Sequence, residues 1–105
     1  MRAPLVLLLL ALTSSASAEP RDACATGTRY RGSTIDLDVK GADVHDVFRL
    51  LANVGKTNIV VADDVRGRVT LTLKKVPWDQ VMCTIAAVHR LRIAVDGNVL
   101  LVTSR

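Results

Sequence analysis

The sequence has few of the residues that bind nucleic acid. One tryptophan, one tyrosine and one phenylalanine are its only aromatic residues among 105. So few rings leave almost nothing on which nucleic-acid bases could stack. The net charge of +4 is small and spread along the chain, which also argues against a nucleic-acid surface.

Groupings of reactive side chains are missing as well. His45 and His89 are the only histidines, and neither has a cysteine or carboxylate at metal-ligand spacing, so we expect both to be solvated. Asp63 and Asp64 could pass for paired catalytic carboxylates, but beside Gly67 they fit a turn better. No nucleophile with a base at motif spacing and no glycine-rich phosphate loop occurs. The sequence therefore predicts no enzyme, no metal and no cofactor.

A long apolar run occurs only near the start of the chain. Residues 5–12 are unbroken, follow the positive charge of Arg2, and precede small residues that end in Ala16-Ser17-Ala18. A charged start, a short apolar core and a small-residue exit are typical of a secretory signal. The run is well short of the ~20 residues that span a bilayer. We expect a signal peptide over residues 1–18, removed on export.

Cleavage there would leave Glu19 to Arg105, which is 105 − 18 = 87 residues and suits one domain. Because Arg2 would leave with the signal, the net charge would fall from +4 to +3. Residues 19–33 are polar and show no periodicity, so we expect an extended N-terminal arm. The ordered domain is expected over residues 34–103.

Hydrophobic periodicity predicts the elements of the first half. Residues 35–39 alternate apolar and polar, as in a half-buried strand. Asp43 suits a helix start, and apolar residues then recur at helical spacing. Gly55 stands where a left-handed residue commonly closes a helix. A short strand over residues 58–62 and a turn over residues 63–67 follow.

The second half repeats that order. Residues 69–73 give the clearest strand signal, and Pro77 suits the first helical position, where proline is favoured. The buried stripe of that helix is predicted to consist of Trp78, Val81, Met82, Ile85 and Val88. Residues 93–95 lead into a hairpin turn at Asp96-Gly97-Asn98, and residues 99–102 form the last strand. The order is strand, helix, strand, strand, helix, strand, strand, which is an α+β fold.

A shift of 34 residues aligns the two halves. It produces seven identities across residues 35–61, which are Leu37/Leu71, Lys40/Lys74, Val47/Val81, Ala52/Ala86, Val54/Val88, Ile59/Ile93 and Val61/Val95. The repeat supports two strand–helix–strand halves on one core. The predicted core consists of Ile35, Leu37, Val47, Leu51, Ile59, Val69, Leu71, Trp78, Ile85 and Ile93. For Trp78 a core position is favoured, and a partner-facing hot spot is the alternative.

Several segments resemble the short N-terminal domain that secretins share with TonB-dependent signalling receptors. These segments are Tyr30-Arg31-Gly32-Ser33-Thr34-Ile35-Asp36-Leu37-Asp38-Val39, residues 42–52, Asn58-Ile59-Val60-Val61, Gly67-Arg68-Val69-Thr70-Leu71 and Val76-Pro77-Trp78-Asp79-Gln80. The last of them is closer to type IV pilus secretins than to TonB receptors. The resemblance covers about residues 30–102 and identifies the chain as a stand-alone secretin-type domain.

The resemblance implies two helices held between two small mixed β-sheets, in the order β-α-β-β-α-β-β. It implies no catalysis and a role in docking other proteins at the periplasmic end of outer-membrane assemblies. The pore-forming region of secretins has no counterpart here, so we expect no channel. Family members usually have glycine near Arg90 and an outward polar residue at the position of Cys83.

The functional hypothesis is therefore a periplasmic module that binds a secretin or another pilus or type II secretion component. The alternative is a signalling domain that contacts a periplasmic regulator, as in TonB-linked receptors. Partner binding is assigned to exposed sheet edge and to Arg68, Thr70, Thr72 and Lys74, the outer face of the clearest strand. The simpler interpretations are a solvated sheet face, or binding on the first helix around His45 and Arg49.

The two cysteines, Cys24 and Cys83, remain after cleavage and would meet an oxidising compartment. We expect a disulfide between them, because Cys83 is predicted on the helix side opposite the apolar stripe. A free Cys24, or a bond to another chain, stays open as an alternative.

Overall fold

The computed structural model describes residues 21–105, and the predicted signal peptide over residues 1–18 lies outside the described residues. The elements are β1 (Arg21–Asp22), β2 (Thr34–Asp43), α1 (Val44–Gly55), β3 (Asn58–Val61), β4 (Arg68–Pro77), α2 (Trp78–His89), β5 (Leu91–Asp96) and β6 (Val99–Ser104). The order predicted from the sequence is confirmed from β2 onward. The one addition is β1, a two-residue strand inside the segment expected to be an extended arm.

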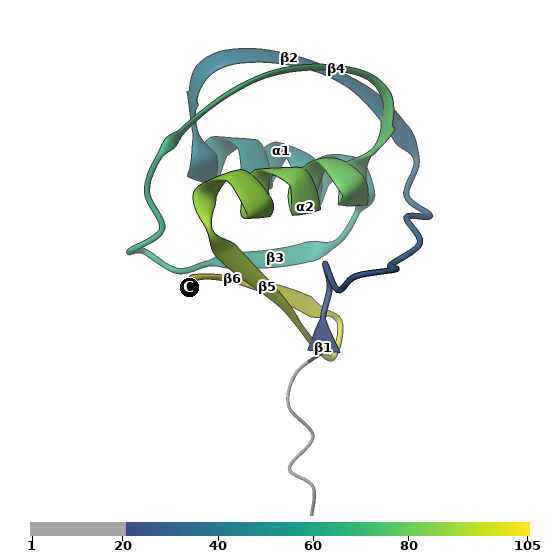
Figure 1. The fold of residues 1–105 in the computed structure, drawn as a ribbon, viewed down its shortest axis with the longest axis vertical. Coiled ribbons are helices and arrows are strands. Elements are labelled where there is room, and N and C mark those ends of the chain that lie inside the picture. Colours follow the sequence, from purple (N-terminus) through teal and green to yellow (C-terminus); the bar gives the residue numbers. More distant parts are fainter. Residues whose placement is uncertain (1–20) are drawn as a thin grey trace, which may run out of the picture.

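The elements form three layers (Figure 1). Both helices lie between an arch made of β2 and β4 and a larger sheet in the order β1-β5-β6-β3. In the larger sheet β3 runs parallel to β6, while β5 runs antiparallel to both β6 and β1. The α+β class is confirmed. Only this sheet is mixed, however, because β2 and β4 pair antiparallel.

Helix α1 begins and ends at defined residues. As predicted, Asp43 caps its start: the Asp43 carboxylate accepts a hydrogen bond from the His45 backbone N–H at 2.8 Å. The predicted end is wrong by one residue, since Lys56 adopts the left-handed conformation (φ 47°) and Gly55 is helical. Gly55 is required for a different reason: a Cβ there would come within 2.5 Å of the Trp78 ring.

Helix α2 follows β4 without a loop. Pro77 was expected at the first helical position but is the N-cap, one residue earlier, and supplies no side-chain hydrogen bond. The helix closes at Arg90, which is left-handed (φ 55°), a conformation that glycine adopts most readily. The predicted apolar stripe is wrong at Val88, whose side chain is 73% exposed. Val81, Met82 and Ile85 are buried as predicted, and the buried face is completed by Cys83 and Ala86 and does not include Val88.

The core draws buried residues from both halves. Six of the ten predicted core residues are buried, namely Leu37, Val47, Leu51, Val69, Ile85 and Ile93. The other four, Ile35, Ile59, Leu71 and Trp78, are partly buried and pack against them. Periodicity understated the centre of the core, where Phe48, Val65 and Val102 are at most 1% exposed.

The internal repeat is a structural pseudo-twofold. Thr34–Asp43 and Arg68–Pro77 are related by 34 residues, and so are the two helices. The pairing of β2 with β4 is symmetric about Asp38↔Thr72 and contains two bulges. The bulges lie at equivalent left-handed residues, Gly41 and Lys75. Each bulge N–H donates to the side chain opposite, Gly41 to Thr70 Oγ1 (2.9 Å) and Lys75 to Asp36 Oδ1 (2.8 Å).

Candidate protein-docking surfaces

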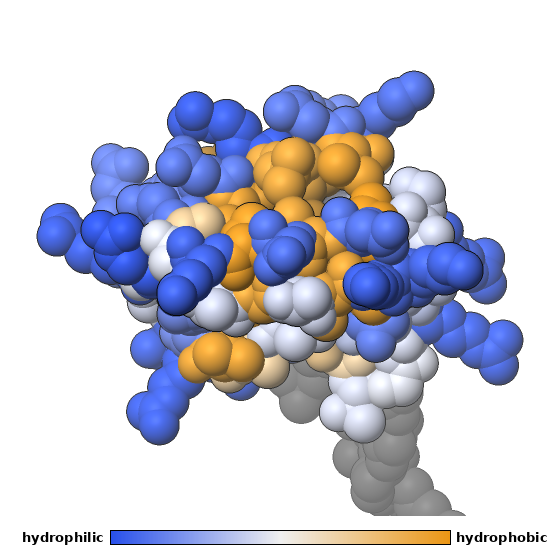
Figure 2. Space-filling model, turned by 90° about the horizontal axis from the view of Figure 1, so that it is seen from above, coloured by the Kyte–Doolittle hydropathy of each residue, from blue (hydrophilic) through white to orange (hydrophobic). Residues whose placement is uncertain are grey.

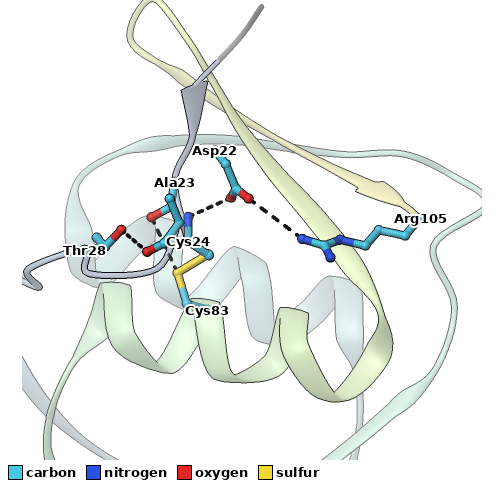
Figure 3. Close-up of polar contacts among 7 residues, drawn as sticks. Asp22, Ala23, Cys24, Thr28, Cys83 and Arg105 are labelled. Carbon is cyan, nitrogen blue, oxygen red and sulfur yellow. Dashed lines mark hydrogen bonds and ion pairs between the residues drawn. A yellow bond between two sulfur atoms is a disulfide. The ribbon is translucent and has the colours of Figure 1, made fainter.

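The N-terminal arm is docked on the second half of the molecule (Figure 3). Arg21 pairs with Val95 on β5, and the Ala23 N–H donates to the Ile93 carbonyl at 2.8 Å. Cys24 and Cys83 form a disulfide with a Cα–Cα distance of 5.5 Å, which is the expected pairing. The arm therefore adds a strand to the larger sheet and is fixed covalently to α2.

This docking corrects the predicted position of Cys83. Cys83 is only 7% exposed and belongs to the core cluster, because the arm covers that side of α2. The Asp79 carboxylate accepts hydrogen bonds from the Arg31 N–H (3.0 Å) and the Gly32 N–H (3.2 Å) farther along the arm. Asp22 lies 3.8 Å from the Arg105 guanidinium, a contact too exposed to stabilise the fold much.

The predicted binding row lies on the outer face of β4. Arg68, Thr70, Thr72 and Lys74 are all exposed, as expected. The first three also contact β2: the Arg68 guanidinium donates to the Gly41 carbonyl (3.0 Å), and the Thr72 hydroxyl donates to Asp38 (3.1 Å). Asp36 and Asp38 are exposed on the neighbouring strand, so this face carries both signs of charge.

A shallow apolar groove runs beside the free edge of β4. It has a volume of about 400 Å³, and Leu71, Ile85 and Val88 are among its lining residues. Figure 2 views the molecule from the side of the β2–β4 arch and shows apolar side chains gathered there, ringed by polar ones. Among residues 21–105, Val88 is the most exposed large apolar residue. An uncovered strand edge with apolar contacts beside it is the surface to which an extended peptide can add.

Neither histidine belongs to a reactive site. His45 Nε2 lies 2.7 Å from the Val65 carbonyl, and the His89 ring lies against Gly67. Asp63 and Asp64 form the predicted turn and are exposed. Within residues 21–105, no three potential metal ligands come together. Neither α1 nor α2 has the length and hydropathy to cross a membrane.

Comparisons with known proteins give this fold a family. No protein-family model matches the chain. Over 76 residues it is 33% identical to the type IV pilus biogenesis and competence protein PilQ of Neisseria meningitidis, a match that covers 72% of this chain and 10% of that protein. The structure of the Vibrio cholerae type IV competence pilus secretin PilQ superposes with a TM-score of 0.57 at 39% identity, covering 68% of this chain and 17% of the other.

The chain is homologous to the N-terminal region of type IV pilus secretins. Its fold is also that of the N0 domain of the type II secretin from enterotoxigenic Escherichia coli, with a TM-score of 0.63, 14% identity, and coverage of 70% of this chain and 96% of that domain. The secretin resemblance predicted from the sequence is confirmed. The homology supports a domain of the kind found in pilus and secretion machines, and the homologous secretin N-terminal domains are structural or interaction modules rather than enzymes. The chain spans about a tenth of the length of the pilus relatives.

Sequence reasoning missed two features of the secretin-type domain. The spacing of Val88 fits the apolar stripe and predicts a core residue. In the structure Val88 lies on the surface, where it lines the groove beside β4. Strand β1 has no periodic signal, since Arg21 and Asp22 are both polar. The available signal was the pair of cysteines, because a bond from Cys24 to Cys83 forces the preceding residues against the second half.

Proposed function

We propose that this chain is a periplasmic, non-enzymatic docking module that binds a protein component of a secretin-type outer-membrane machine. Homology to pilus secretin N-terminal regions supports the machine, and the predicted signal peptide over residues 1–18 supports the compartment. The working unit would begin at Glu19, with an arm over residues 19–33 and a domain over residues 34–103. The relatives favour this role over contact with a signalling regulator.

The observation that carries the proposal is the two-stranded sheet with uncovered edges. Among residues 21–105, β2 and β4 pair only with each other, so each leaves one side of its backbone free. Such edges are templates for an incoming strand, and natural proteins usually shorten or cover them. Here β4 is ten residues long and exposed apolar surface lies beside it at Val88.

The proposed partner is an extended segment of a secretin or pilus component that adds to the β4 edge. Main-chain pairing and the groove at Val88 would supply most of the affinity. Arg68 and Lys74 would set the association rate and its salt dependence through carboxylates of the partner. Asp36 and Asp38 on β2 would disfavour a uniformly acidic partner, so its charges should be few and near the β4 side.

A charge-reversal pull-down tests the proposal. Arg68→Glu/Lys74→Glu should fold normally and lose its pilus or secretion partner, identified by mass spectrometry from a periplasmic extract. The matched control, Arg29→Glu/Arg92→Glu, makes the same charge change on exposed residues away from the β2–β4 arch and should retain the partner. Equal capture by both double variants would remove this face from the interface. Capture that never includes a pilus or secretion component would contradict the proposed function.

A further inference from the structure

Because of the pseudo-twofold, the site at which the arm docks on the second half has an equivalent on the first half. On the second half, β1 pairs with the side of β5 that faces away from β6. The equivalent strand of the first half is β3, which pairs with β6 on one side only among residues 21–105. Helix α1 stands beside β3 as α2 stands beside β5. The first half therefore contains the same docking position without an arm.

A groove marks that position between α1 and β3. It encloses about 250 Å³ and is lined by His45, Phe48, Arg49, Ala52, Ile59 and Val61. The Ala62 N–H donates to the Val102 carbonyl on β6. Because backbone groups alternate sides along a strand, those of Ile59 and Val61 face the open edge. Their equivalents Ile93 and Val95 are the residues that meet the arm.

Exposure at equivalent positions shows what the arm covers. Ala52, which lines the groove, is partly buried, whereas its equivalent, Ala86, is 3% exposed. Ile59 is partly buried where Ile93 is 1% exposed. These differences occur where the arm contacts the second half, although Val61 and the arm-paired Val95 are both partly buried. The groove on the first half thus has the exposure of a strand site that lacks its strand.

We propose that the α1–β3 groove docks an extended segment of a partner protein, which adds antiparallel to β3 and places a carboxylate beside Arg49. Antiparallel addition is how β1 meets β5. Arg49 is the equivalent of Cys83, so the partner residue at the place of Cys24 would face a guanidinium instead of a sulfur. The groove lining contains this cation and no carboxylate, which selects an acidic segment.

Two other occupants fit less well. The arm of this chain is held on the second half by the Cys24–Cys83 disulfide and cannot reach the groove. A second copy that paired through the same β3 edge would bring its own Arg49 groove to this one and join like charges. The inference rests on the symmetry of the fold, and it stands whichever machine the domain serves.

A peptide titration tests the charge and the position together. The probe is a synthetic peptide that copies residues 21–28 with Cys24→Glu, added to the isotope-labelled, oxidised chain at up to millimolar concentration. Amide NMR signals of Arg49, Ile59 and Val61 should shift on titration. The variant Arg49→Glu should bind about tenfold more weakly and should prefer a peptide with Cys24→Lys. The matched charge change Arg66→Glu should leave the affinity unchanged.

Absence of shifts at Ile59 and Val61 would overturn the inference, and so would shifts that Arg49→Glu leaves intact. Shifts confined to β4 would also overturn it, while leaving the proposed function standing. A second measurement is independent of charge: the Arg49→Cys thiol should attack a peptide that copies residues 21–28 with its cysteine supplied as the glutathione mixed disulfide, bond to the peptide sulfur and release glutathione. Under thiol–disulfide exchange, Arg49→Cys should capture at least about tenfold more peptide than the exposed control Asn53→Cys. Equal capture would show that the groove does not orient a strand.

Discussion

The first half of the domain, residues 34–61, and the second half, residues 68–95, share a backbone plan and differ in what covers them. Strand β5 is paired on both sides, by β6 and by β1, whereas β3 is paired by β6 alone within the described chain. The position that is Arg49 on α1 is Cys83 on α2, and only Cys83 is bonded to the arm. The comparison shows how a repeated unit can keep one frame while one copy is closed and the other stays open.

The two halves also start their helices differently. Asp43 caps α1 with its carboxylate, while Pro77 gives α2 no side-chain hydrogen bond. The residue after each cap shows the same asymmetry: Val44 is fully buried, whereas Trp78 is partly exposed and lies over Gly55. The frame therefore tolerates different side chains at equivalent positions as long as the bulges and helix ends are preserved.

Truncation of the shared core should have the largest effect and should be equal in the two halves. Leu51 and its equivalent, Ile85, are at most 2% exposed. Leu51→Ala and Ile85→Ala should each lower the free energy of unfolding by roughly 2–5 kcal/mol, from lost burial and the cavity left behind. Denaturant titration of each variant measures this loss. A cost below ~1 kcal/mol at either site would break the equivalence of the halves.

Removal of the disulfide should reveal a difference in stability between the two halves. Cys24→Ser/Cys83→Ser should cost about 2–4 kcal/mol, because the bridge closes a long loop in the unfolded chain. The equivalent change on the first half, Arg49→Ser, should cost less than ~0.5 kcal/mol, as expected for an exposed site. Thermal unfolding of the three proteins compares them. A double variant as stable as the parent would mean that the arm contributes no stability to the second half.

The helix ends should show the smallest effects and equal ones. Lys56 and Arg90 are both left-handed at equivalent positions. Lys56→Gly and Arg90→Gly should each stabilise the domain by up to about 1 kcal/mol, since glycine accepts this conformation without a Cβ clash. Denaturant midpoints check the gain. Destabilisation by either change would indicate that the side chain makes a compensating contact.

The sequence predicted what depends on local pattern and missed what depends on coverage by distant segments. The Asp43 cap and the turn at residues 63–67 are local, and both are confirmed. The 34-residue repeat predicted two equivalent halves, and in the structure the bulges and the helix ends recur at the same spacing. Cys83 was judged by its side of the helix, and no helical pattern shows that an arm 59 residues earlier covers it.

The sequence predicted that the row on β4 is exposed, but it did not predict the contacts of that row or the open edge of β3. The outward row on β4 follows from strand alternation, and its exposure is confirmed. Its contacts with β2 required the cross-strand register, which the sequence did not supply. The open edge of β3 required the pairing order of four strands, which is a property of the whole sheet.

Amide hydrogen exchange at two equivalent residues tests the closed and open halves most directly. Val95 faces β1 and pairs with Arg21, whereas Val61 faces the open edge of β3. In the oxidised, unbound protein, the Val61 amide should exchange at least about a hundredfold faster than that of Val95. Reduction of the disulfide should release β1 and bring Val95 close to the rate of Val61. Equal protection of the two amides in the oxidised protein would contradict the account, because it would show that the first half is covered as well.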